Sequence, residues 1–125
     1  MENWTLIWTK LEKFTSEVVN QLRNNIPGVY RLSYKHQDGN YYVFYIGQSG
    51  DSQGIKERLS QHFLESEPNV CISNYLKKEK CYFRYAHITN KEVRNATERQ
   101  VYNIYQPTCN EIQPNGRDDI QVNLS

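Results

Sequence analysis

Two short runs rich in β-branched and aromatic residues constrain the fold more than any other feature of the sequence. They span residues 29–34 and 41–46 and contain the residue types that are enriched in strands. Asp38-Gly39-Asn40 lies between them and is typical of a tight turn, because glycine readily adopts the positive φ that hairpin turns require. The two runs therefore predict an antiparallel hairpin.

The hairpin carries several tyrosines whose placement follows from strand geometry. Side chains alternate between the faces of a strand, so Tyr30, Leu32 and Tyr34 share one face, and Tyr45 shares a face with Val43. A suitable register would bring Tyr30 and Tyr45 side by side. On the hairpin alone, an ordinary structural role for both tyrosines is the simpler interpretation.

Helical periodicity and further strand-like runs surround the hairpin. Apolar residues at three- and four-residue steps predict helices over about 4–23, 55–64, 72–76 and 91–105. Asn90 is a suitable N-cap for the last helix, and Pro107 prevents its continuation. Residues 81–88 predict a third strand, and 120–124 a short additional one. The order of elements predicts an α+β fold: a small three-stranded antiparallel sheet flanked by helices, with an extra N-terminal helix.

Composition narrows the function classes. The chain has 125 residues, the size of one domain, and a formal net charge of +1, which argues against extensive non-specific binding to nucleic acid. It contains no apolar run long enough to span a membrane, so we expect no membrane association and a cytoplasmic location. The three cysteines form no C-x-x-C pair, and this spacing predicts reduced thiols rather than a zinc site or a disulfide framework.

Three polar residues on predicted helices are candidates for phosphate chemistry. Arg58 and His62 are four positions apart and therefore project from one helix face, where an arginine could bind a phosphate. Glu98 lies at the edge of an apolar stripe and could hold a divalent cation. The alternatives are a solvated flank for Arg58 and His62, and a weak helical ion pair between Glu98 and Arg94.

In their order along the chain, these residues resemble the GIY-YIG nuclease superfamily. Gly28-Val29-Tyr30 is similar to its first tripeptide, with valine in place of isoleucine, and Tyr45-Ile46-Gly47 is similar to its second. The remaining matching positions are Arg58, His62, Glu98, and Pro107 with Asn110 in the pattern P-x-x-N. The resemblance covers residues 27–110, which leaves 1–26 as an N-terminal helical extension and 111–125 as a C-terminal tail.

The resemblance implies a metal-dependent endonuclease that hydrolyses phosphodiester bonds by a one-metal mechanism, with DNA as the expected substrate. It implies that Glu98 binds Mg²⁺ or Mn²⁺. The catalytic residues that it implies are Tyr30, Tyr45, Arg58, His62 and Glu98. The substrate-binding residues are Gly47, Gln48, Ser49 and Asn110. Tyr30 and His62 both remain candidates for the general base.

Two further possibilities remain open at this level. The same scaffold could serve as a non-catalytic nucleic-acid-binding or adaptor module, which the near-neutral charge favours. A homodimer could form through the N-terminal segment, near Trp4 and Trp8, because one active site cuts one strand. The alternative, which we favour, is that this segment packs on the core of its own chain. The sequence does not specify the target sequence, the choice between DNA and RNA or between single and double strands, or the biological pathway.

Overall fold

An antiparallel sheet lies at the centre of the molecule. The computed structural model describes residues 2–50, 53–64, 67–110 and 113–124. In these residues, four strands pair in the order β2 (Glu12–Lys13), β5 (Cys81–His87), β3 (Gly28–Lys35) and β4 (Tyr41–Ser49). The α+β class is confirmed, but the prediction of three strands was wrong. The additional strand, β2, has only two residues, which pair with Phe83 and Tyr82 of β5. A strand this short has no recognisable pattern in the sequence.

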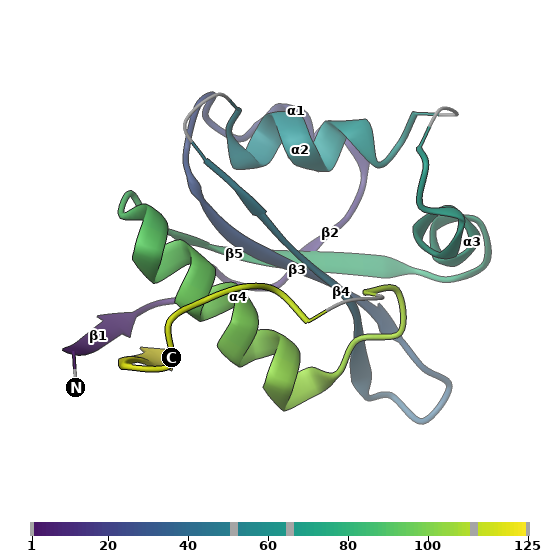
Figure 1. Cartoon of the computed structure of the whole chain (residues 1–125). Coiled ribbons are helices and arrows are strands. Elements are labelled where there is room, and N and C mark those ends of the chain that lie inside the picture. Colours follow the sequence, from purple (N-terminus) through teal and green to yellow (C-terminus); the bar gives the residue numbers. More distant parts are fainter. Residues whose placement is uncertain (1, 51–52, 65–66, 111–112, 125) are drawn as a thin grey trace.

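Helices cover both faces of this sheet (Figure 1). On one face, α1 (Ser16–Asn20), α2 (Ile55–Gln61) and α3 (Val70–Lys78) pack against the side of the sheet that carries Tyr30. On the other face, α4 (Lys91–Tyr105) packs against the side that carries Val29. Two separate apolar clusters result, one on each face of the sheet.

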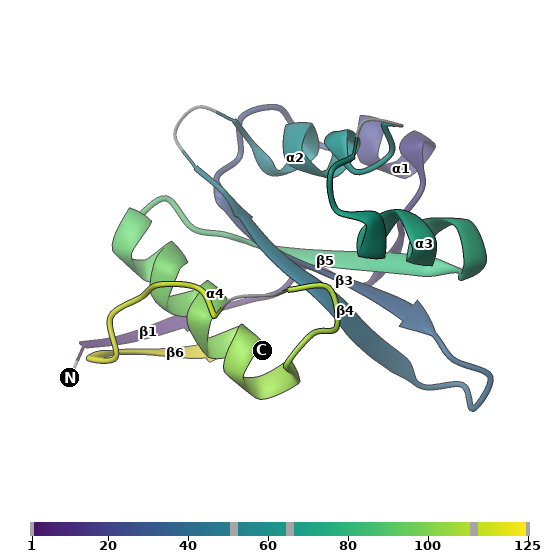
Figure 2. The same cartoon turned by 45° about the vertical axis from the view of Figure 1, so that its right-hand side comes forward.

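The predicted helix over residues 4–23 was wrong. Residues Glu2–Leu6 form β1, which pairs in parallel with β6 (Ile120–Leu124) from the other end of the chain, as Figure 2 shows. Trp4, Leu6 and Trp8 pack in the α4-side cluster, whereas Ile7 is 73% exposed. This alternation is a strand period, and the helix is confined to α1, which begins after the N-cap Thr15.

A bulge in the hairpin corrects the predicted faces of its side chains. The register shifts between Leu32 and Ser33, so that Leu32 pairs with Tyr45 and Ser33 with Val43. An extra residue in one strand reverses the alternation beyond it. Tyr45 therefore packs with the Tyr30 cluster, whereas Val43 packs with the cluster on the opposite face. The prediction that Tyr45 and Val43 share a face was wrong for this reason.

A disulfide joins α3 to the segment after α4. Cys71 and Cys109 are bonded, with a sequence separation of 38 residues and Cα atoms 5.4 Å apart, and Cys81 is a buried free thiol. The prediction that all three cysteines are reduced was wrong, because linear spacing does not reveal which thiols the fold brings together.

The helices are short or polar relative to what a membrane span requires in the described part of the chain. Over those residues, none is both long and apolar enough to cross one.

Candidate functional site

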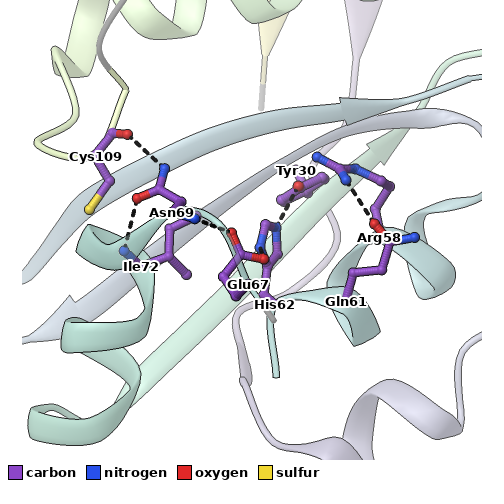
Figure 3. Close-up of polar contacts among 8 residues, drawn as sticks. All are labelled: Tyr30, Arg58, Gln61, His62, Glu67, Asn69, Ile72 and Cys109. Carbon is purple, nitrogen blue, oxygen red and sulfur yellow. Dashed lines mark hydrogen bonds and ion pairs between the residues drawn. The ribbon is translucent and has the colours of Figure 1, made fainter. Parts of the chain in front are cut away.

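A chain of polar side chains begins on the central strand and crosses to the loop before α3 (Figure 3). The hydroxyl of Tyr30 lies 2.8 Å from Nε2 of His62, and Nδ1 of the same histidine lies 3.2 Å from Oε2 of Glu67. Tyr30 comes from β3, His62 is the C-cap residue of α2, and Glu67 precedes α3. Three elements that are separate in sequence thus meet at one imidazole ring.

Tyr30 is fully buried, and the absence of a side chain at Gly47 makes room for it. Gly47 is paired with Tyr30 across the hairpin, and a Cβ atom there would lie 2.4 Å from the tyrosine oxygen. Burial, followed by the neighbouring Tyr45, raises the pKa of Tyr30 well above its usual value. The phenol is therefore neutral, and His62 is a partner that can accept a hydrogen bond from its hydroxyl.

The His62 imidazole is held in its neutral form by its surroundings. Its side chain is 2% exposed, and burial lowers its pKa from the usual value, while the carboxylate of Glu67 acts in the opposite direction. A neutral imidazole with one free lone pair can accept a proton.

Tyr45 and Arg58 border the same site. The Tyr45 ring lies 6.2 Å from that of Tyr30 and 5.5 Å from that of His62, between ring centroids. Burial raises the pKa of Tyr45, and the positive charge of Arg58 opposes this rise. Arg58 also donates to Oε1 of Gln61 at 2.8 Å, which holds one edge of its guanidinium in place (Figure 3). The i, i+4 spacing of Arg58 and His62 thus brings both to one site.

Glu98 interacts electrostatically with Tyr30, Tyr45 and Arg58. It lies on α4, and burial raises its pKa from 4.5 to about 7, against a hydrogen bond from Gln48 and the charge of Arg58. Its charge also raises the pKa values of Tyr30 and Tyr45. A carboxyl group in this state is costly to ionise without a nearby cation.

An open cleft of about 880 Å³ lies beside the chain of polar residues. Its walls include Tyr45, Arg58, His62, Glu67 and Asn110. The Cys71–Cys109 disulfide forms part of the same wall, and the side chain of Asn69 donates to the carbonyl of Cys109 at 3.1 Å. The cleft therefore presents a guanidinium, an imidazole and amide groups to one volume, which is a suitable combination for an anionic ligand.

The remaining predicted residues make structural contacts, and of these Asn110 lines the cleft whereas Gln48 and Ser49 do not. Asn110 donates to the carbonyl of Ile46 at 2.9 Å and accepts from its amide at 2.8 Å, which completes the hydrogen bonding of the edge strand β4. Gln48 donates to Asn95 at 2.8 Å. The buried hydroxyl of Ser49 donates to the carbonyl of Gln53 at 2.6 Å and so closes the loop after β4.

Glu67 and Asn69 were missed by sequence reasoning. Both lie in the connection between α2 and α3, where no periodic pattern or motif marks them. The one local signal is that Asn69 is a good N-cap residue, and it does cap α3 by accepting from the amide of Ile72 at 3.2 Å. The contact between Glu67 and His62 becomes visible only once the fold is known.

Three comparisons with known proteins bear on the identity of the site. No protein-family model, curated protein or solved structure matches the chain. Among the residues that the structure describes, no three His, Cys, Asp or Glu side chains gather into a cluster able to hold a metal ion. The case for a function therefore depends on the site itself.

Proposed function

We propose that the protein is a metal-dependent endonuclease that hydrolyses phosphodiester bonds in nucleic acid, with DNA as the expected substrate. The observation that carries the proposal is the contact between Tyr30 and His62 at 2.8 Å, beside Arg58 and within the electrostatic reach of Glu98. Tyr30 of β3 and His62 of α2 are in contact, and the charges of Arg58 and Glu98 both act on Tyr30, which supports the proposal. A scattered arrangement of the same residues would have argued against this function.

The chemistry of phosphodiester hydrolysis fits these groups. Negative charge increases on the phosphate oxygens as water attacks, so fixed positive charge stabilises the transition state. The Arg58 guanidinium lines the cleft and offers paired donors that match two phosphate oxygens. Tyr45, which lines the same cleft and lies within reach of the Arg58 charge, then orients either the phosphate or the attacking water.

Glu98 fits the binding of Mg²⁺ or Mn²⁺. Magnesium sites often use one carboxylate and retain several waters, so a cluster of three acidic residues is not required. The carboxyl of Glu98 has a pKa of about 7 because burial disfavours its charge, and a bound cation would relieve that cost. The ion, once bound, would neutralise charge on the scissile phosphate and the leaving oxygen.

The hydrogen bonds favour a shared proton path over a single base. The buried phenol of Tyr30 is a poor base alone, because its pKa is raised well above the usual value. His62 is neutral, lines the cleft and lies 2.8 Å from the phenol oxygen, so it can take the phenol proton. Tyr30 is fully buried, so the proposal requires that substrate binding admit the attacking water to its hydroxyl, which then takes a proton from that water. We therefore propose that Tyr30 and His62 act together, with the contact between them as the support for this proposal.

The direct experiment is cleavage by the purified protein. Labelled single- and double-stranded DNA and RNA would be incubated with Mg²⁺, with Mn²⁺ or with EDTA. We expect cleavage of DNA that depends on the metal and is lost in Glu98→Ala. If no substrate is cut under any condition, the proposed activity is refuted and the adaptor-module alternative gains support. That alternative is tested by measuring whether the protein binds the same nucleic acids.

The proposed function also raises the questions of oligomeric state and cellular location. A duplex cut on both strands would require either two copies of the chain or two successive events, and sedimentation with and without DNA would distinguish them. We propose a cytoplasmic location, for which the Cys71–Cys109 disulfide gives no support, because reducing conditions there favour the free thiols. Redox labelling of the protein isolated from cells would test this location.

A further inference from the structure

We propose that Glu67 is a positioning residue that fixes the tautomer of His62 and thereby directs the proton of Tyr30 onto the imidazole. This inference rests on the proposed nuclease function for its catalytic consequence, but its structural part stands on the geometry of three side chains. Glu67 is outside the set of residues that the GIY-YIG resemblance implies.

The position of Glu67 is fixed from both of its carboxylate oxygens. Oε2 lies 3.2 Å from Nδ1 of His62, and Oε1 accepts from the backbone amide of Asn69 at 3.1 Å. The backbone amide of Glu67 donates to the carbonyl of Leu64 at 3.0 Å. The side chain is only 7% exposed, so this carboxylate is largely shielded from solvent and held in place by its partners at the wall of the cleft.

The contact with Glu67 decides which nitrogen of His62 carries the hydrogen. An ionised carboxylate can only accept hydrogen bonds, so Nδ1 must be the donor. In a neutral imidazole, Nε2 then has a free lone pair, which points to the hydroxyl of Tyr30 at 2.8 Å. The Tyr30 hydroxyl must therefore be the donor to Nε2 of His62, so its proton already points to the nitrogen that would accept it.

The charged and titratable groups around His62 are consistent with this arrangement. Tyr30 faces it from β3, Tyr45 from β4, Arg58 from α2, and Glu67 from the loop before α3. Arg58 disfavours a charged imidazole and Glu67 favours one. Glu67 is therefore the nearby group that can stabilise the imidazolium formed when His62 accepts the proton.

The connection to α3 explains how the fold holds Glu67 in place. Asn69 caps α3 through its side-chain oxygen and donates from its side-chain nitrogen to the carbonyl of Cys109, as Figure 3 shows. Cys109 is in turn bonded to Cys71 of α3. The segment that begins at Glu67 is thus anchored to both α3 and the end of the α4 connection.

Nuclear magnetic resonance of His62 tests the tautomer without requiring any activity. Long-range correlations between ring hydrogens and nitrogens at neutral pH, with His62→Gln used for assignment, show which nitrogen carries the hydrogen. We expect Nδ1–H in the wild type and in the control Glu17→Gln, whose exposed side chain also loses a charge. In Glu67→Gln, the amide can donate to Nδ1, so we expect a shift to Nε2–H.

Cleavage kinetics of the same variants test the consequence. We expect Glu67→Gln to lower kcat by roughly 10²- to 10⁴-fold with little change in KM, as expected when an imidazole is held in the wrong tautomer. Glu67→Asp, which keeps the carboxylate, should recover part of the rate, and Glu17→Gln should match the wild type.

Each result bears on one of the two proposals. A wild-type His62 in the Nε2–H form, or unchanged Nδ1–H and kcat in Glu67→Gln, would overturn the role of Glu67. A wild type that cuts no nucleic acid, yet shows Nδ1–H that shifts in Glu67→Gln, would support the tautomer assignment and refute the nuclease.

Discussion

Replacing Glu98 with glutamine should stabilise the metal-free protein while it abolishes cleavage. Burial raises the pKa of this carboxyl from 4.5 to about 7, so ionisation costs the folded state more than the unfolded state. One unit of pKa shift corresponds to about 1.4 kcal/mol, and after allowance for partial exposure the full difference is about 2–3 kcal/mol. Glutamine has nearly the same shape and no charge to bury.

The sign of the pH dependence follows from proton binding. Below pH 4.5 the carboxyl is protonated in both states and contributes no difference. Between pH 4.5 and about 7 the unfolded chain ionises first, so the folded state holds more protons and the wild type loses stability as pH rises. Above about pH 7 the loss is complete. The variant lacks this loss, so its advantage should develop across that range.

Urea denaturation in EDTA at pH 4 and pH 8 measures the effect. The free energy of unfolding of Glu98→Gln minus that of the wild type should increase by about 2–3 kcal/mol between the two pH values. Glu17→Gln, at an exposed position, should show no comparable increase. A difference for Glu98→Gln that is constant with pH would refute the reasoning, as would stabilisation of both proteins alike by Mg²⁺.

Three other predictions concern the supports of the site. Gly47→Ala places a Cβ 2.4 Å from the hydroxyl of Tyr30, so it should lower the free energy of unfolding by about 1–3 kcal/mol, measured by urea denaturation. An equal loss in a Tyr30→Ala background would contradict this clash as the cause. Reduction of Cys71–Cys109, which spans 38 residues, should lower the free energy of unfolding by about 4 kcal/mol, measured in urea with and without dithiothreitol; an unchanged midpoint would refute it. Asn110→Ala removes both hydrogen bonds to Ile46 and should cost about 1–3 kcal/mol, whereas a loss below 0.5 kcal/mol would argue against the role of Asn110 at the edge of β4.

Elements with strong local signals were predictable from the sequence. The predicted helix over 91–105 has the same bounds as α4, because Asn90 caps it and Gln106 takes the left-handed conformation that ends it before Pro107. The hairpin and the short strand at 120–124 are also confirmed. Capping and turn residues mark where such elements begin and end. Their bounds can therefore be predicted without knowing what they pack against.

Elements that depend on distant partners were not predictable in the same way. Residues 2–13 contain apolar residues at helical spacing, yet β1 is fixed by β6, which lies more than a hundred residues away in sequence. β2 consists of two polar residues and is a strand only because it pairs with β5. Pairing of this kind is a tertiary effect that overrides local propensity.

The candidate site shows the same division. Tyr30, Arg58, His62 and Glu98 could be selected in advance because their order along the chain resembles a known pattern. Glu67 could not, because it lies in an irregular connection and acquires its partner only through the fold. The bulge that turns Tyr45 towards Tyr30 was also invisible, since one extra residue in a strand leaves no signal in the composition.

The most direct test of the central claim is the single-turnover rate of DNA cleavage by Tyr30→Phe in Mg²⁺. This change removes only the hydroxyl that contacts His62 at 2.8 Å and keeps the buried ring that Gly47 accommodates. The account predicts a rate at least about 10²-fold below that of the wild type, because proton transfer from water loses its path. A rate equal to that of the wild type would contradict it and would leave Tyr30 as a structural aromatic residue.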